Sequence, residues 1–122
     1  MNNKKIGKDF EKEYAKILAD EGYWVLLVTP KGYINSQPMD IIATKNNIFY
    51  GFECKTLHSK YKRFPLSRLE ENQRQAFKRL KKIGSNNYFL VVKWNNEIIY
   101  LIPFTEIDLN QKSILLEDKY KI

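Results

Sequence analysis

The spacing of apolar residues along the chain predicts two helices. From Lys8 to Glu21 apolar side chains recur at three- and four-residue steps, the period of one helix face, and Gly22 is placed to end this helix. A second helix is expected to end near Ile83, with Gly84 as its cap. The segment Ser67-Arg68-Leu69-Glu70 has the form of a capping box that would begin it. Its expected buried stripe runs through Leu69, Gln73, Ala76, Leu80 and Ile83, in which Gln73 is the one polar side chain.

Five runs rich in β-branched and aromatic residues predict strands. Their expected bounds are Tyr23–Thr29, Met39–Lys45, Ile48–Leu57, Tyr88–Trp94 and Glu97–Ile102. The first is typical of a buried strand. The pairs Asn46-Asn47 and Asn95-Asn96 suit tight turns with positive φ at both central residues, and so predict two hairpins.

These elements follow one another in the order α-β-β-β-α-β-β, and residues 1–122 are expected to form a single domain around one core. The last stretch, Phe104 to Ile122, alternates weakly between charged and apolar residues. A short helix, an edge strand and a partner-binding tail all remain open for it.

An excess of basic residues points to a polyanionic partner. Lysine and arginine number 21 against 14 acidic residues, which gives a formal charge of +7, and nucleic acid is the first candidate. Many soluble proteins are equally basic without binding nucleic acid, so charge alone leaves the question open. The lone Cys54 excludes an intramolecular disulfide, and neither a signal peptide nor a run of ~20 apolar residues is present. We therefore expect a cytoplasmic protein with no membrane partner.

One hairpin carries a group of charged residues suited to metal chemistry. Residues two apart in a strand share a face, so Glu53 and Lys55 point the same way and Cys54 points to the other. Folding about Asn46-Asn47 brings Asp40 near Glu53. Two carboxylates at one open site suit Mg²⁺ or Mn²⁺, and such an ion lowers the pKa of a water molecule and offsets charge on phosphorus oxygens. Lys55 could orient the water or neutralise the phosphate, and the sequence does not separate these roles.

The alternative is that Glu53 and Lys55 form the solvated face of an edge strand. Apolar residues on both faces of the segment argue against it. Phe49, Gly51 and Leu57 share the face of the charged pair, and Ile48, Tyr50, Phe52 and Cys54 form the other. Such a strand should be central, where charges are costly to bury unless they are paired or bind a metal. This favours a functional site.

Three motifs in order resemble known nucleases. Asp40, a thirteen-residue step to Glu53, and then Lys55 resemble the D…ExK core of the PD-(D/E)xK nucleases. Residues 5–11 resemble the opening of archaeal Holliday junction resolvases, in which a glycine is followed four residues later by a metal-site glutamate, here Glu11. Residues 64–66 and 71–73 resemble the bacterial RecU resolvases, which carry a glutamine on the second helix, here Gln73.

This resemblance implies a restriction-endonuclease-like α/β fold, with a central mixed β-sheet flanked by helices. It implies an endonuclease that resolves four-way DNA junctions, with Mg²⁺, or Mn²⁺ as a substitute, bound by Glu11, Asp40 and Glu53. Lys55 and Gln73 complete the catalytic set. Two symmetric cuts need two active sites, so a homodimer acting on branched DNA is expected. Pro38 stands one residue earlier than in a strict Pro-Asp pair, and the chain is shorter than a typical RecU.

The two helix positions can also be examined from periodicity alone. Glu11 and Glu13 flank opposite sides of the first apolar stripe, so only the resemblance prefers Glu11. Gln73 interrupts a buried stripe. A glutamine bonded to a backbone group in the core would explain that equally well, and both explanations can hold at once.

The loop that follows the ExK strand is the candidate DNA contact. Lys60, Tyr61, Lys62 and Arg63 combine phosphate donors with an aromatic ring. An ordinary solvated loop is the alternative, and basic residues of the second helix could extend the surface. His58 is left out of the catalytic set because a lone loop histidine is usually solvated. Three other functions stay open: a restriction or repair endonuclease acting on linear duplex, a non-catalytic DNA-binding module, and a structural protein.

Overall fold

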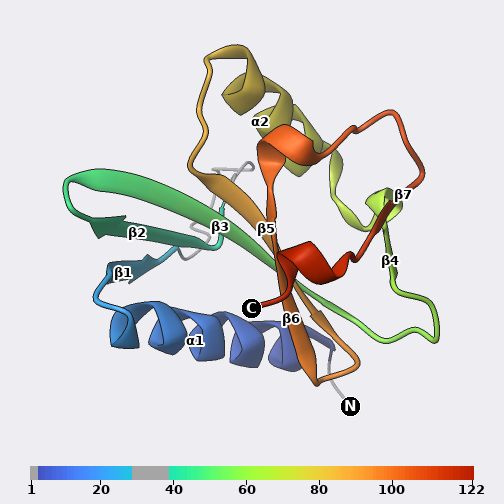
Figure 1. Cartoon of the computed structure of the whole chain (residues 1–122), viewed down its shortest axis with the longest axis horizontal. Helices are drawn as coiled ribbons and strands as arrows, with labels where there is room; N and C mark the ends of the chain where they lie inside the picture. The colour runs from blue at the N-terminus through green and yellow to red at the C-terminus, as the bar shows by residue number, and fades with distance from the viewer. Residues whose placement is uncertain (1–2, 29–38) are drawn as a thin grey trace.

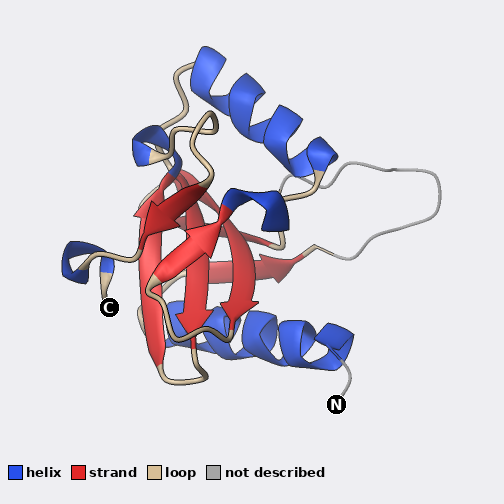
Figure 2. Ribbon diagram, turned by 90° about the vertical axis from the view of Figure 1, so that its right-hand side faces the viewer, coloured by secondary structure: helices blue, strands red, loops and turns tan. Residues whose placement is uncertain are grey.

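The computed structural model describes residues 3–28 and 39–122. The main β-sheet forms the middle layer of the domain, and one long helix covers each of its two faces (Figures 1 and 2). In chain order the elements are α1 (Asn3–Asp20), β1 (Trp24–Leu27), β2 (Ile41–Lys45), β3 (Ile48–Leu57), β4 (Arg63–Pro65), η1 (Leu66–Arg68), α2 (Glu71–Lys82), β5 (Tyr88–Trp94), β6 (Ile98–Pro103), η2 (Phe104–Glu106), β7 (Ser113–Leu115) and η3 (Asp118–Tyr120).

The main sheet has five strands in the order β1-β2-β3-β5-β6. β3 and β5 are parallel, and the other neighbours are antiparallel, so the sheet is mixed as predicted. Both predicted hairpin turns are confirmed, because Asn46, Asn47, Asn95 and Asn96 all have positive φ. The crossover from β3 to β5 runs through β4, η1 and α2.

Two hydrophobic clusters hold the helices against opposite faces of this sheet. Phe10, Tyr14 and Leu18 of α1 pack with Phe52 and Cys54 of β3. On the other face Phe77 of α2 belongs to the cluster that contains Leu57. The side chains of β3 therefore alternate between the α1 and α2 sides, as the strand pattern predicts. No helix in the described part of the chain is long and apolar enough to cross a membrane.

A gap in the sheet positions the functional site. β2 pairs with β3 only from Lys45↔Ile48 to Ile41↔Phe52, whereas β3 continues to Leu57. From Glu53 onward β3 is paired with β5 on one side and has no strand on the other side among the described residues. We call this unpaired side the open edge of β3. β3 is central as far as Phe52, and Glu53 beyond that point is 1% exposed, so the alternative of a solvated strand face does not hold for Glu53.

Several expected features of the helices and strands are wrong. α1 begins at Asn3, because Ile6 continues its apolar stripe one turn before Phe10. Ser67 does not cap α2: it lies in the 3₁₀ turn η1, and the N-cap is Glu70. Ile83 is 73% exposed, and Phe77 is buried instead.

The strand expected at Tyr23–Thr29 is shorter and is not buried. β1 is the outer strand of the sheet, so Trp24 and Leu26 are exposed. Thr29, and with it the proposed loop to Pro38, lies outside the described residues.

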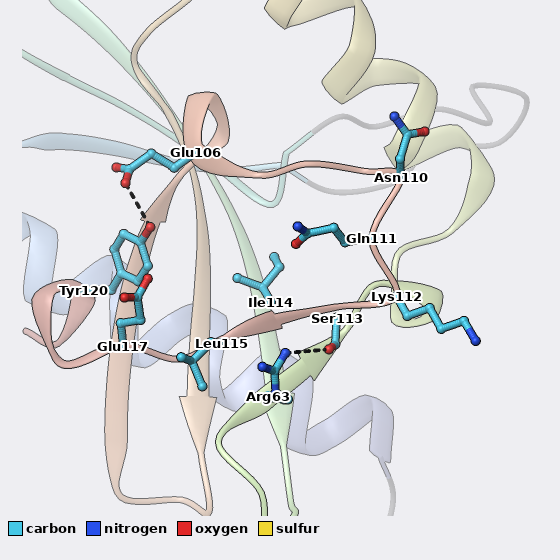
Figure 3. Close-up of a pocket in the computed structure, with 10 residues that line it drawn as sticks. All are labelled: Arg63, Glu106, Asn110, Gln111, Lys112, Ser113, Ile114, Leu115, Glu117 and Tyr120. Carbon is cyan, nitrogen blue, oxygen red and sulfur yellow. Dashed lines mark hydrogen bonds between the residues drawn. The ribbon is translucent and has the colours of Figure 1, made fainter.

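The C-terminal stretch folds back onto the domain as two 3₁₀ turns and a short strand. β7 pairs antiparallel with β4, and Phe104, Ile107, Leu116 and Tyr120 are buried. Figure 3 shows the cavity beneath this segment, where Arg63 donates to Ser113 Oγ at 3.2 Å and Tyr120 donates to Glu106 at 2.9 Å. Charges of both signs line the cavity, which has a volume of about 600 Å³. It therefore lacks the uniform positive charge expected of a DNA-binding groove.

Candidate active site

All five predicted catalytic residues line one cleft with a volume of about 800 Å³. Glu11 comes from α1, Asp40 from the residue before β2, Glu53 and Lys55 from β3, and Gln73 from α2. The cleft lies along the open edge of β3, where the two faces of the sheet meet. That gap explains how a residue of α1 and a residue of α2, which cover opposite faces, reach the same site.

Asp40 is fixed on the open edge by three hydrogen bonds. Its backbone N–H donates to Phe52 O at 3.0 Å, and its backbone carbonyl accepts from Val28 at 2.9 Å. Its side-chain Oδ2 accepts from the N–H of Cys54 at 2.9 Å. The Asp40 carboxylate thus accepts the Cys54 N–H, a role that a backbone carbonyl would have if β2 extended further along β3.

Glu53 is the one buried charged side chain among the described residues, with 1% of its surface exposed. Gln73 Nε2 donates to its Oε2, while Oε1 has no hydrogen-bond partner in the described part of the chain. Burial raises the pKa of Glu53 to about 10, and the neighbouring carboxylate of Asp40 adds to this effect. Two adjacent carboxylates repel each other unless a proton or a cation lies between them.

Glu11 belongs to the same group of interacting carboxyls. Its pKa is raised to about 7, mainly by burial and then by the charge of Asp40, while Lys8 and Lys55 lower it. Glu13 instead bonds Lys93 Nζ at 2.6 Å and does not line the cleft. The structure thus separates the two glutamates that periodicity could not.

Gln73 connects the start of α2 to the site. Its Oε1 accepts from the backbone N–H of Glu70 at 3.0 Å, which caps the helix, and its Nε2 holds Glu53. Gln73 thus bonds a backbone group, at the helix N-cap and not in the core, and it also contacts a carboxylate of the predicted site. The capping role fixes the side chain in one orientation, and that orientation presents its amide N–H to the buried carboxylate.

The predicted DNA contacts do not line the cleft, although His58, two residues before Lys60, does. Lys60, Tyr61 and Lys62 are exposed between β3 and β4, and Arg63 begins β4. Reciprocal bonds of 2.9 Å between Ser59 and Asn95, together with a bond of 3.0 Å from Trp94 Nε1 to Tyr61 O, brace this loop against the β5–β6 hairpin. The basic side chains are thus held on a fixed backbone.

Eight further residues line the cleft, and among them Lys8, His58, Arg68 and Glu70 carry acidic or basic side chains that were not assigned to it from the sequence. Lys8 lies one helical turn before Glu11, a spacing that could have indicated it. Arg68 was placed in a capping box that does not form, so its position was missed.

The donor set fits a divalent cation. Three carboxylates line the cleft, and Glu53, whose Oε1 is unsatisfied, interacts with Asp40. Oxygen ligands of this kind are what Mg²⁺ and Mn²⁺ take in proteins. Within residues 3–28 and 39–122, no three acidic, His or Cys side chains are already arranged as a set of metal ligands.

Fold and site together define a nuclease of the restriction-endonuclease-like class. The chain belongs to the archaeal Holliday junction resolvase (Hjc) family, whose family model matches residues 2–121. This membership confirms the predicted function, resolution of Holliday junctions by an endodeoxyribonuclease.

Individual relatives agree with this assignment. The chain is 33% identical to a crossover junction endodeoxyribonuclease, Hje, from Saccharolobus islandicus, over 98% of this chain and 90% of that protein. Hjc from Archaeoglobus fulgidus, a Holliday junction resolvase, has a similar structure, with a TM-score of 0.66, 15% identity, and 93% and 90% of the two chains covered. A bacterial homing endonuclease follows with a TM-score of 0.58, 17% identity, and 99% and 88% covered. The last two likenesses support the fold.

Proposed function

We propose that this chain binds Mg²⁺ through Glu11, Asp40 and Glu53 and, as a homodimer, uses it to hydrolyse phosphodiester bonds at four-way DNA junctions. The observation that carries the proposal is the buried Glu53, whose Oε1 lacks a donor and whose carboxyl interacts with that of Asp40. A bound cation would remove the repulsion between these carboxylates. Mn²⁺ is expected to substitute, and a cytoplasmic location is part of the same proposal because the substrate is cellular DNA.

Each protein group has a distinct task in this proposal. Asp40 has one oxygen bonded to the backbone N–H of Cys54, and its carboxylate would help to hold the ion. Gln73 donates to one oxygen of Glu53 and so orients this second carboxylate. The ion supplies water activation and charge neutralisation. Lys55 lowers the pKa of both glutamates, so its ammonium lies near them and adds positive charge where the phosphate becomes more negative in the transition state.

The proposal is tested with a labelled four-way junction and a matched linear duplex. Paired cuts in the junction alone are expected, in Mg²⁺ but not in EDTA. Lys55→Ala should slow them by about 10²-fold or more, because it removes one charge that stabilises the transition state. Equal cutting of the linear duplex would instead favour a restriction or repair endonuclease. Junction binding without cuts in Mg²⁺ or Mn²⁺ would favour a DNA-binding module.

An exposed apolar surface suits the homodimer. Trp24 and Phe49 are 65% and 67% exposed, and strand register places both on one sheet face with Leu26 and Ile42. We call these four residues the apolar sheet face. It continues directly into the active site, since Asp40 lies two residues before Ile42. A second copy of the chain is the occupant we infer, because paired cuts need a second active site close to the first.

A double variant, Trp24→Ser with Phe49→Ser, is expected to weaken the dimer by at least about 30-fold, the effect of losing one interface hot spot. Sedimentation equilibrium measures this dissociation, and circular dichroism checks that the fold is retained. The pair Ile83→Ser with Leu115→Ser serves as control, because it removes exposed apolar side chains elsewhere. A wild-type chain that sediments as a monomer, or a double variant as dimeric as wild type, would exclude this surface.

A further inference from the structure

Arg68, the last residue of η1, reaches the open edge of β3. Its Nη2 donates to the backbone carbonyl of Thr56 at 3.0 Å. Phe52 and Cys54 direct their backbone groups to the same edge, where both bond Asp40. Because backbone direction alternates along a strand, Thr56 directs its groups there as well. Asp40 and Arg68 therefore occupy successive positions along one strand edge, roughly 7 Å apart by the rise of two strand residues.

The guanidinium of Arg68 is held in place but not neutralised. Its Cζ lies 5.9 Å from the centroid of the Phe64 ring, and the Thr56 carbonyl fixes one of its N–H groups. Arginine has five such donors, and the described residues show no ion pair for this one. A charged group fixed on a carbonyl and an aromatic ring loses little further freedom when it binds an anion.

The other cations of the cleft are placed differently. Lys8 and Lys55 both act on the pKa of Glu11, and Lys55 also acts on that of Glu53, so their charges offset the carboxylates. Arg68 lies further along the edge and contributes to neither of these shifts. It is thus available to a negative group that enters the cleft from outside.

We propose that Arg68 binds a phosphate of the DNA strand that is cut, immediately beside Asp40. The planar guanidinium suits two parallel hydrogen bonds to phosphate oxygens. This contact would set the position of the strand along the open edge and so bring the scissile bond to the carboxylates. The inference rests on the proposed function, because it requires DNA as the substrate of this cleft.

Two substitutions distinguish phosphate binding by Arg68 from a purely structural role, in which Arg68 only braces the Thr56 carbonyl. Arg68→Gln keeps an N–H donor for that carbonyl but carries no charge. Arg68→Lys keeps the charge but loses the planar fork. The charge-matched control is Lys119→Ala, since Lys119 lies at the C-terminal turn and pairs with Glu106 and Glu117.

The experiment measures binding of a fluorescent four-way junction by anisotropy, in Ca²⁺ in place of Mg²⁺, over a range of KCl concentrations. Arg68→Gln is expected to weaken binding by about tenfold, the effect of one charge-assisted hydrogen bond. It should lower the slope of log K against log salt by about 0.9 per protomer. Arg68→Lys should retain the slope and part of the affinity, and Lys119→Ala should change neither.

Wild-type affinity and slope in Arg68→Gln would overturn the inference and assign Arg68 to bracing the strand, while the resolvase proposal would stand. If the wild-type protein itself shows no salt-dependent affinity for the junction, the proposed function is contradicted, and the Arg68 contact is contradicted with it. Melting temperatures of all variants are recorded, so that a binding loss from misfolding is recognised.

Discussion

Asparagine in place of Asp40 is expected to reduce junction cleavage in Mg²⁺ by about 10³-fold or more while junction binding stays within a few-fold of wild type. The asparagine Oδ1 can still accept the N–H of Cys54, which Asp40 accepts at 2.9 Å, so the open edge keeps its geometry. What is lost is the negative charge that would hold the cation, and with it the water activation and charge neutralisation that the cation supplies. Single-turnover cleavage rates and anisotropy binding measure the two effects separately.

Asp118→Asn is the matched control for this substitution, because Asp118 is an exposed aspartate of η3 that does not line the cleft. It should cut at the wild-type rate. If Asp40→Asn retained a tenth or more of the wild-type rate, Asp40 would not be a metal ligand.

Glutamine in place of Glu53 is expected to stabilise the metal-free protein at neutral and alkaline pH. Folding raises the pKa of Glu53 to about 10 and that of Glu11 to about 7, chiefly by burial. A carboxyl with a raised folded pKa contributes stability that is complete below its unfolded pKa of ~4.3 and is lost as the pH rises through the folded value. In EDTA the wild-type protein should therefore lose stability from about pH 5 towards pH 10.

Glu53→Gln should remove the larger part of this pH-dependent loss of stability, because an amide has no proton to release as the pH rises. It can still accept the N–H of Gln73 and can donate towards Asp40. At pH 8 in EDTA its melting temperature should exceed that of wild type by about 4 °C or more, the shift that ~1 kcal/mol gives in a domain of this size.

Added Mg²⁺ should reverse the order of the two proteins, by raising the melting temperature of wild type and not that of the variant. Glu97→Gln, at an exposed turn glutamate, controls for the change of net charge. A Glu53→Gln protein that melts at or below the wild-type temperature in EDTA at pH 8 would contradict the origin assigned to the raised pKa.

Local sequence signals predicted most of the secondary structure because each rests on chemistry within a few residues. The Asn-Asn pairs fixed two turns with positive φ, and the apolar run Ile48–Leu57 gave the bounds of β3. The signals failed where tertiary packing decides. Trp24 and Leu26 are suited to a buried strand, yet β1 is the outer strand. Ser67 is a good N-cap residue, but burial of Leu69 in an extended conformation delays the start of α2.

The candidate site was predictable to the extent that its residues share one hairpin. Strand alternation placed Glu53 and Lys55 on one face, and the turn brought Asp40 close. Glu11 and Gln73 come from helices on opposite faces of the sheet. Only the resemblance to resolvases could indicate Glu11, whereas Gln73 also stood out as a polar residue within an apolar stripe. Arg68 could not be identified at all, because its place depends on where β2 ends and leaves β3 unpaired. That register is a property of the whole sheet.

The most direct test of the proposed metal site is an anomalous difference map from crystals soaked in Mn²⁺. A single strong peak is predicted in the cleft, about 2.1 Å from carboxylate oxygens of Glu11, Asp40 and Glu53. A peak elsewhere, or none at a Mn²⁺ concentration that supports junction cleavage, would show that these carboxylates do not form the metal site.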